Sequence, residues 1–135
     1  MLFRKPAKTV TISKFEKAEI KISGMRSSYK YEIVYGENEC DIILYIYKCT
    51  ADGYEPVPDK RASCRTEDVL EIFNSCCLAA WDGFHGKHPK NVHDGTMFEL
   101  KAVINDGMTI YADGSENFPG HYHELISWLS EAVSN

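Results

Sequence analysis

Residues 94–133, DGTMFELKAVINDGMTIYADGSENFPGHYHELISWLSEAV, decide the fold of this chain. Apolar and polar residues alternate over 96–104 and again over 108–112, which is the period of a β-strand with one buried face. Asn105-Asp106-Gly107 lies between the two runs and supplies the positive-φ position that a tight hairpin requires. A loop rich in turn formers follows, and apolar residues then recur at helical spacing. The stretch therefore predicts a β-hairpin, an ordered loop and a C-terminal helix.

The first half of the chain predicts further strands. Alternating runs at 18–22, 29–35 and 40–49 have the strand period, and a shorter run at 9–12 predicts an edge strand. The run at 40–49 is apolar on both faces, which indicates a central strand. Residues 50–65 contain two prolines and many turn formers, so they predict a long surface loop.

A helix is predicted to follow that loop. Thr66 supplies a capping hydroxyl ahead of Glu67 and Asp68, which the helix dipole favours at this end. Apolar residues then repeat at helical spacing as far as Trp81, and Asp82-Gly83 ends the helix. We therefore predict an α+β fold, with an antiparallel sheet of about five or six strands and two helices packed on one face.

Length and composition favour an ordinary globular protein. The 135 residues are 44% hydrophobic and 26% charged, which predicts a single globular domain over 1–135, with a loose basic lead-in at 1–8. The net charge of −5 argues against nucleic acid as a partner. No apolar run has the length of a membrane span, and no secretory signal is evident. Unless a leader precedes the sequence, we expect a cytoplasmic protein whose five cysteines are thiols.

The histidines offer one candidate site. His85, His88 and His93 lie in a polar segment, and His121 and His123 lie near the start of the last helix. Together these five side chains suggest a zinc site and a metal-dependent hydrolase or metal-binding protein, as an alternative hypothesis. Their spacing matches no structural zinc signature, so we expect exposed loop histidines and no cofactor.

Other chemistry is weakly supported. Cys76 and Cys77 lie toward the C-terminal end of their helix, where the dipole disfavours a thiolate, so core packing is expected. No phosphate-binding loop or nucleophile elbow is present, and we predict no catalytic residue. Tyrosines are numerous in the strands, and those on an uncovered sheet face would form a recognition surface. The tyrosines concerned are Tyr29, Tyr31, Tyr35, Tyr45 and Tyr47.

Several features of the C-terminal third occur together: Trp81-Asp82-Gly83-Phe84, Asp94-Gly95-Thr96, the predicted hairpin, Gly114-Ser115-Glu116-Asn117-Phe118-Pro119 and Tyr122. Over about residues 81–130 this pattern resembles a group of small bacterial proteins without established activity. Those proteins carry a similar Gly-Ser-x-Asn-x-Phe/Tyr-Pro loop before their last helix. The resemblance implies an α+β fold and a bacterial source, and no function.

The loop itself is predicted to be structural, with Phe118 in the core. A ligand pocket between the loop and the segment 81–84 is the alternative, and its binding residues would be Trp81, Phe84, Ser115 and Asn117. For the whole protein we predict a non-enzymatic binding or protein-interaction domain. Its partner would be a second copy, or a protein that it neutralises in the manner of an immunity protein.

Overall fold

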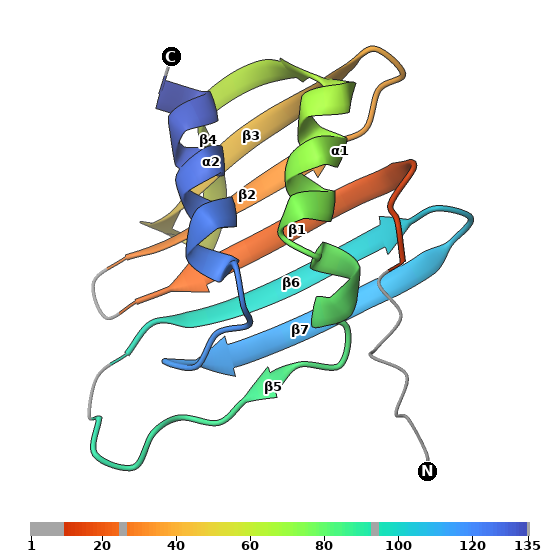
Figure 1. Ribbon diagram of the computed structural model, residues 1–135. Helices are drawn as coiled ribbons and strands as arrows, with labels where there is room; N and C mark the ends of the chain where they lie inside the picture. The colour runs from red at the N-terminus through yellow and green to blue at the C-terminus, as the bar shows by residue number, and fades with distance from the viewer. Residues whose placement is uncertain (1–9, 25–26, 93–94, 135) are drawn as a thin grey trace, which may run out of the picture.

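The computed structural model describes residues 10–24, 27–92 and 95–134. They form one twisted sheet with two helices side by side on one of its faces (Figure 1). The elements, in chain order, are β1 (Phe15–Ser23), β2 (Ser28–Val34), β3 (Glu39–Thr50), β4 (Gly53–Arg65), α1 (Thr66–Ser75), the 3-10 helix η1 (Leu78–Trp81), β5 (His85–Gly86), β6 (Met97–Ile104), β7 (Met108–Ser115) and α2 (Tyr122–Ser134).

The sheet order follows from short connections between neighbours. Strands β1 to β4 form an antiparallel meander, and the β6–β7 hairpin pairs with the free side of β1, giving the order β4-β3-β2-β1-β6-β7-β5. Alternate residues of the central strands point toward the helices, and Ile20, Ile33 and Leu100 are almost completely buried there. Helices α1 and α2 complete this core with Phe73 and Leu129, as their apolar spacing predicts.

The α+β class is confirmed, but two details of the predicted sheet are wrong. The sheet has seven strands instead of five or six, and it is mixed, because β5 pairs with β7 in the parallel direction. The additional strands are β4 and β5. Segment 82–86 lies along the outer edge of β7, where the amide of Asp113 donates to the carbonyl of Phe84 at 3.0 Å. Strand β5 has only two residues, so it is too short to show the alternation of apolar and polar residues by which a strand is predicted from sequence.

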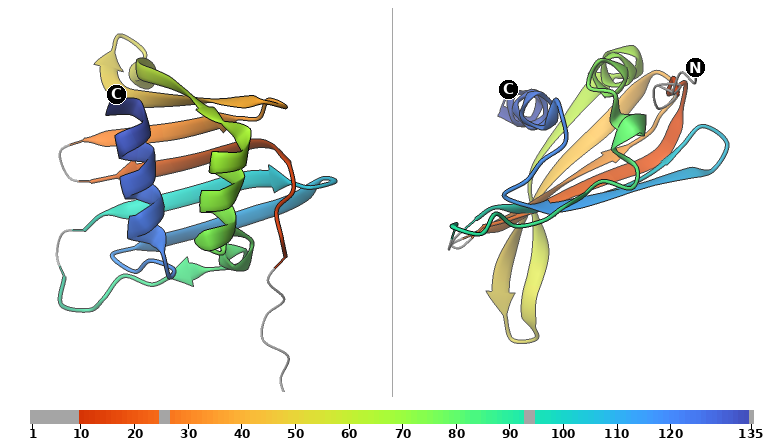
Figure 2. Two further views of the ribbon diagram at one scale, coloured as in Figure 1. Left: turned by 45° about the horizontal axis from the view of Figure 1, so that its top comes forward. Right: turned by 60° about the horizontal axis from the view of Figure 1, so that its bottom comes forward.

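The predicted loop at 50–65 is also wrong, since most of it is the edge strand β4. Pro56 and Pro58 are compatible with a strand here because β4 has a neighbour on one side alone, so its outer side needs no amide donor. The register shifts between Leu44 and Tyr45, which marks a β-bulge. Beyond it the β3–β4 hairpin leaves the sheet on the side opposite the helices (Figure 2).

The predicted edge strand at 9–12 does not form over the part that is described. Residues 10–14 have no strand conformation, although Ile12 is buried. The side-chain amide of Asn74 makes the hydrogen bonds that a neighbouring strand would otherwise make to Ile12. Its oxygen accepts from the Ile12 amide at 2.7 Å, and its nitrogen donates to the Ile12 carbonyl at 3.0 Å. Thr9 and the predicted lead-in at 1–8 lie outside the described residues.

Helix α1 is shorter than predicted. It ends at Ser75, because Cys77 adopts a left-handed conformation with φ of 55°, and the chain continues as η1. This break turns Leu78 and Trp81 into the core. Thr66 begins the helix without capping it, since its hydroxyl donates to the carbonyl of Gly36 at 2.5 Å. Across the described residues, no helix has the length and apolar character needed to cross a membrane.

Candidate functional site

The sheet face that α1 and α2 leave uncovered is the candidate site, and we call it the open face. Both helices lie on the other side of the sheet (Figure 2). Because side chains alternate along each strand, the residues opposite the core residues point to this face. The charged and aromatic members of the open face include Lys17, Glu19, Lys21, Lys30, Glu32, Tyr45, Tyr47, Glu99, Lys101, Tyr111 and Asp113, and the strand register also places Asp41 and Arg61 there.

The charges of the open face are balanced and paired. On β1, β2, β6 and β7 the face carries four lysines and four carboxylates, which alternate in sign along β1, β2 and β6. Directly opposed residues differ in sign between β1 and β6 but have the same sign between β1 and β2. The ammonium of Lys17 lies 2.9 Å from Glu19 and 3.1 Å from Glu32. The hydrogen bond to Glu19 raises the pKa of Lys17, and the same bond lowers the pKa of Glu19. The face therefore carries many charges with little net charge.

Two tyrosines extend this pattern toward the β3–β4 hairpin. The ammonium of Lys30 lies 4.9 Å from the ring centroid of Tyr45, and that of Lys21 lies 4.6 Å from the ring of Tyr47. Both distances fit cation–π contacts. The Tyr45 hydroxyl also donates to Glu32 at 3.4 Å. These contacts connect Tyr45 to β2 and Tyr47 to β1.

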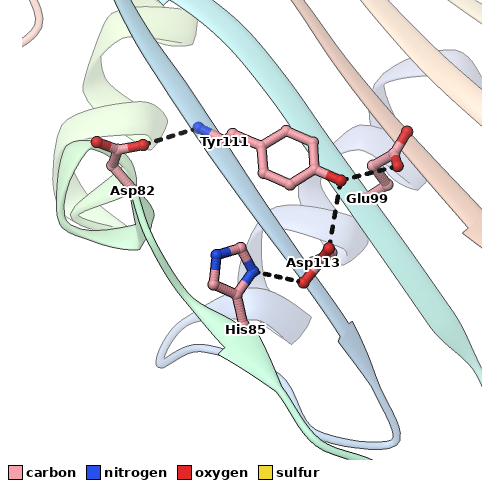
Figure 3. Close-up of polar contacts among 5 residues, drawn as sticks. All are labelled: Asp82, His85, Glu99, Tyr111 and Asp113. Carbon is pink, nitrogen blue, oxygen red and sulfur yellow. Dashed lines mark hydrogen bonds and ion pairs between the residues drawn. The ribbon is translucent and has the colours of Figure 1, made fainter.

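Tyr111 is the centre of a second polar group on this face (Figure 3). Its hydroxyl lies 3.0 Å from a carboxylate oxygen of Glu99 and 3.2 Å from one of Asp113. The other oxygen of Asp113 lies 2.8 Å from Nδ1 of His85. Hydrogen bonding to Glu99 is the main reason that the pKa of Tyr111 rises to about 12, with smaller contributions from desolvation and Asp113. The phenol therefore stays neutral at physiological pH and acts as a donor.

The backbone around Tyr111 is fixed by the segment that precedes β5. The Tyr111 amide donates to the carboxylate of Asp82 at 2.9 Å (Figure 3), and the Gly83 amide donates to the Tyr111 carbonyl at 2.9 Å. The edge of β7 is thereby occupied over Tyr111 and Asp113. This leaves the face of the strand, and not its edge, as the accessible part.

Three hollows adjoin one another on the open face. One of about 350 Å³ lies between Lys21, Glu99 and Asp113. Another of about 350 Å³ is lined by residues that include Lys17, Lys101 and Tyr111. A smaller one of about 210 Å³ shares lining residues with both. The surface of the open face is therefore uneven, with three adjoining shallow depressions between its side chains.

The hairpin tip projects past this face, and we call residues 48–56 the arm. All of its residues are exposed, including Tyr54 at 74%. Its turn is closed by the Thr50 hydroxyl, which donates to the carbonyl of Gly53 at 2.9 Å, and Gly53 has the positive φ of 111° that the turn needs. The arm thus presents a large aromatic side chain beyond the main sheet.

Of the four predicted binding residues, Ser115 lines the hollow between Lys21, Glu99 and Asp113, and the other three line none of the open-face hollows described above. Trp81 is buried at 3% exposure, and its indole donates to the Cys76 carbonyl at 3.2 Å. Phe84 is half-buried against Phe98, which also contacts Trp81. Ser115 and Asn117 bond within the same region, the first to Nδ1 of His88 at 2.7 Å and the second to the Lys87 carbonyl at 3.3 Å. Phe98 lies between the loop and segment 81–84, because its ring contacts Phe118 of the loop as well as Trp81 and Phe84.

The predicted metal ligands have separate partners where they are described. His85 contacts Asp113, His88 contacts Ser115, and His121 contacts Glu124 at 3.0 Å. His123 packs against the rings of Phe118 and Tyr122, and His93 lies outside the described residues. Over 10–24, 27–92 and 95–134, no three His, Cys, Asp or Glu side chains are grouped to hold a metal ion.

Two of the five cysteines, Cys40 and Cys76, are core residues. All five lie in the described part of the chain and are free thiols. Cys40 and Cys76 are completely buried, and Cys49 is exposed. Burial raises the pKa of Cys76, which disfavours its thiolate.

Sequence reasoning identified part of the open face. The tyrosine hypothesis included Tyr45 and Tyr47, which lie there, but also Tyr31, which the helices bury. It missed Tyr111 and Asp113, because a single tyrosine and an Asp-Gly pair carry no signal for a shared network. The alternation of lysine and glutamate in β1 was a usable signal that those side chains lie on the uncovered side of the sheet.

Comparison of this chain with protein-family models, curated proteins and solved structures finds no match. The resemblance to small bacterial proteins over residues 81–130 stays a prediction. In the structure that segment contains the last residue of η1, the strands β5, β6 and β7, and most of α2.

Proposed function

We propose that the protein is a non-enzymatic protein-interaction domain that binds a second copy of itself through the open face and the arm. The arm is the observation that carries the proposal. It extends a β-hairpin past the sheet on the uncovered side and exposes Tyr54, a residue type enriched in protein interfaces. Five free thiols suit a reducing compartment such as the cytoplasm.

The charge distribution supports a second copy as the partner. Each chain carries a net charge of −5, so two copies repel one another in most orientations. On β1, β2, β6 and β7 the open face has equal numbers of lysines and carboxylates, so contacts there avoid much of that repulsion. In a twofold dimer each contact occurs twice, so one lysine–carboxylate contact between the two copies is repeated by symmetry.

The edges of the sheet support a face contact over a strand-to-strand contact. Pro56 and Pro58 lie in the edge strand β4, where proline removes donors that a further strand would need. At the other end, segment 82–86 bonds to β7. Extension of the sheet by a neighbouring chain is therefore disfavoured on both sides.

Sedimentation velocity over about 1–200 µM protein tests the proposal, and we expect a concentration-dependent shift from monomer to dimer. Tyr54→Ser should weaken the dimer about tenfold or more, because an exposed tyrosine of the arm would become a buried anchor in the dimer. Met108→Ser is the matched control: it removes an exposed apolar side chain at the β6–β7 turn and should leave the equilibrium unchanged. A wild-type chain that sediments as a monomer throughout would overturn the proposal.

A further inference from the structure

A hollow of about 350 Å³ lies on the helix side of the sheet, away from the open face. Four aromatic side chains from three parts of the chain line it. Tyr29 comes from β2, Phe118 from the loop after β7, and Tyr122 and His123 from the first turn of α2. Aromatic residues therefore enclose this space from the sheet, from the loop and from the helix.

The rings on the helix side hold one another in fixed orientations. Phe118 and Tyr122 stack with centroids 4.4 Å apart and an angle of 20° between their planes. The ring of His123 stands at 85° to Tyr122, with centroids 5.1 Å apart, and at 65° to Phe118. The cluster is anchored in the core, because Phe118 and Tyr122 also contact Phe98. The aromatic wall is therefore present before any ligand arrives.

Glu116 adds a carboxylate to the same hollow. Its backbone adopts a left-handed conformation with φ of 48°, and its amide donates to the Thr96 carbonyl at 2.8 Å. One carboxylate oxygen accepts from the Thr96 amide, which fixes the side chain in place. Burial raises the pKa of Tyr122, and the nearby Tyr29 and Glu116 raise it further, so the carboxylate contributes negative potential inside the hollow.

We propose that this hollow binds an alkylammonium cation. Ring faces attract an organic cation through their quadrupoles, and the combination of several rings with a carboxylate is the chemistry that recognises substituted ammonium groups. Glu116 would repel an anion, and no Lys or Arg is among the described residues that line the hollow. The inference is independent of the open face and of the proposed dimer.

Choline and its neutral isostere 3,3-dimethylbutan-1-ol provide a direct test, because they share shape and differ in charge. Titrated into ¹⁵N-labelled full-length protein at constant ionic strength, choline should shift the amide resonances of residues 116–123 saturably, with a Kd on the order of 1 mM. The neutral alcohol should bind about tenfold more weakly or not at all. Equal binding of the two would overturn the proposal, and so would the absence of shifts with choline.

Two substitutions separate the cation site from a nonspecific effect. Glu116→Gln keeps an oxygen that accepts from the Thr96 amide, and Tyr29→Leu keeps apolar bulk while removing a ring. Each should weaken choline binding severalfold. Glu131→Gln is the matched control, because it removes a carboxylate from the exposed side of α2, outside the hollow, and should leave binding unchanged. Unchanged binding in both hollow variants would contradict the assignment.

The natural source of the cation is resolved by a third ligand. Nα-acetyl-trimethyllysine methylamide carries the same cationic group on a peptide-like backbone. Binding tighter than that of choline would assign the hollow to a methylated protein segment, and tighter choline binding would assign it to a small molecule or a lipid headgroup. Either result supports an alkylammonium site.

Discussion

Trp81→Ala is expected to lower the free energy of unfolding by about 4 kcal/mol, the cost of removing a fully buried indole. Trp81 is 3% exposed, packs near Phe98 and Tyr122, and donates from its indole to the Cys76 carbonyl. The substitution leaves a cavity under η1 and an unpaired carbonyl. For a chain of this size the melting temperature should fall by roughly 10–15 °C.

Trp128→Ala is the matched control for that experiment. Trp128 lies on α2 and is partly exposed, so the same substitution removes fewer buried contacts and should cost about 1–2 kcal/mol. Urea unfolding followed by far-ultraviolet circular dichroism gives both values, because it does not depend on tryptophan fluorescence. Equal losses in the two variants would contradict the placement of Trp81 in the core. A small loss of unfolding free energy in Trp81→Ala would favour the alternative hypothesis, in which Trp81 is a binding residue.

Gly114→Ala is expected to cost about 3 kcal/mol for a steric reason. Gly114 pairs with Phe98 across β6 and β7, and the carbonyl of Asn117 folds back over its Cα. A Cβ atom built there would overlap that carbonyl oxygen and would lie 2.8 Å from the Phe98 ring. Because one obstacle is backbone, it can move away only if the whole loop shifts.

Gly120→Ala, six residues later, provides the comparison for Gly114→Ala. A Cβ atom at Gly120 meets nothing within 4 Å, so this change should leave stability nearly unchanged. Denaturation midpoints of the two variants, measured under identical conditions, give the difference. Similar midpoints would show that the loop after β7 is not held against Gly114. A clearly lower midpoint for Gly114→Ala than for Gly120→Ala would establish that close packing leaves no room for a side chain at Gly114.

Periodicity was sufficient for the central strands, for α2 and for α1 as far as Ser75. Ala18, Ile20 and Ile22 alternate with charged residues or serine and form the buried side of β1, as predicted. The β6–β7 hairpin and α2 also follow the sequence pattern. In these elements a single strong signal, the separation of an apolar face from a polar face, agrees with the tertiary structure.

Local signals failed where distant partners decide the conformation. Pro56 and Pro58 are typical of loops, and only the position of β4 at the sheet edge makes them acceptable in a strand. Thr66 has the chemistry of a helix cap, but its hydroxyl bonds to Gly36 because the β2–β3 turn lies close to the start of α1. The candidate sites were hidden for the same reason: Glu99, Tyr111 and Asp113 meet only after β6 and β7 pair.

The attachment of residues 10–14 has a consequence for the order of folding. The Ile12 amide bonds to a side chain 62 residues later, and the Ser13 amide bonds to Asn105, 92 residues later. During synthesis on the ribosome this segment emerges before its partners and acquires them only after α1 and the β6–β7 turn exist. Contacts of such high sequence separation are entropically costly to close early. The first part of the described chain to be made is thus expected to be among the last parts to become protected from hydrogen exchange.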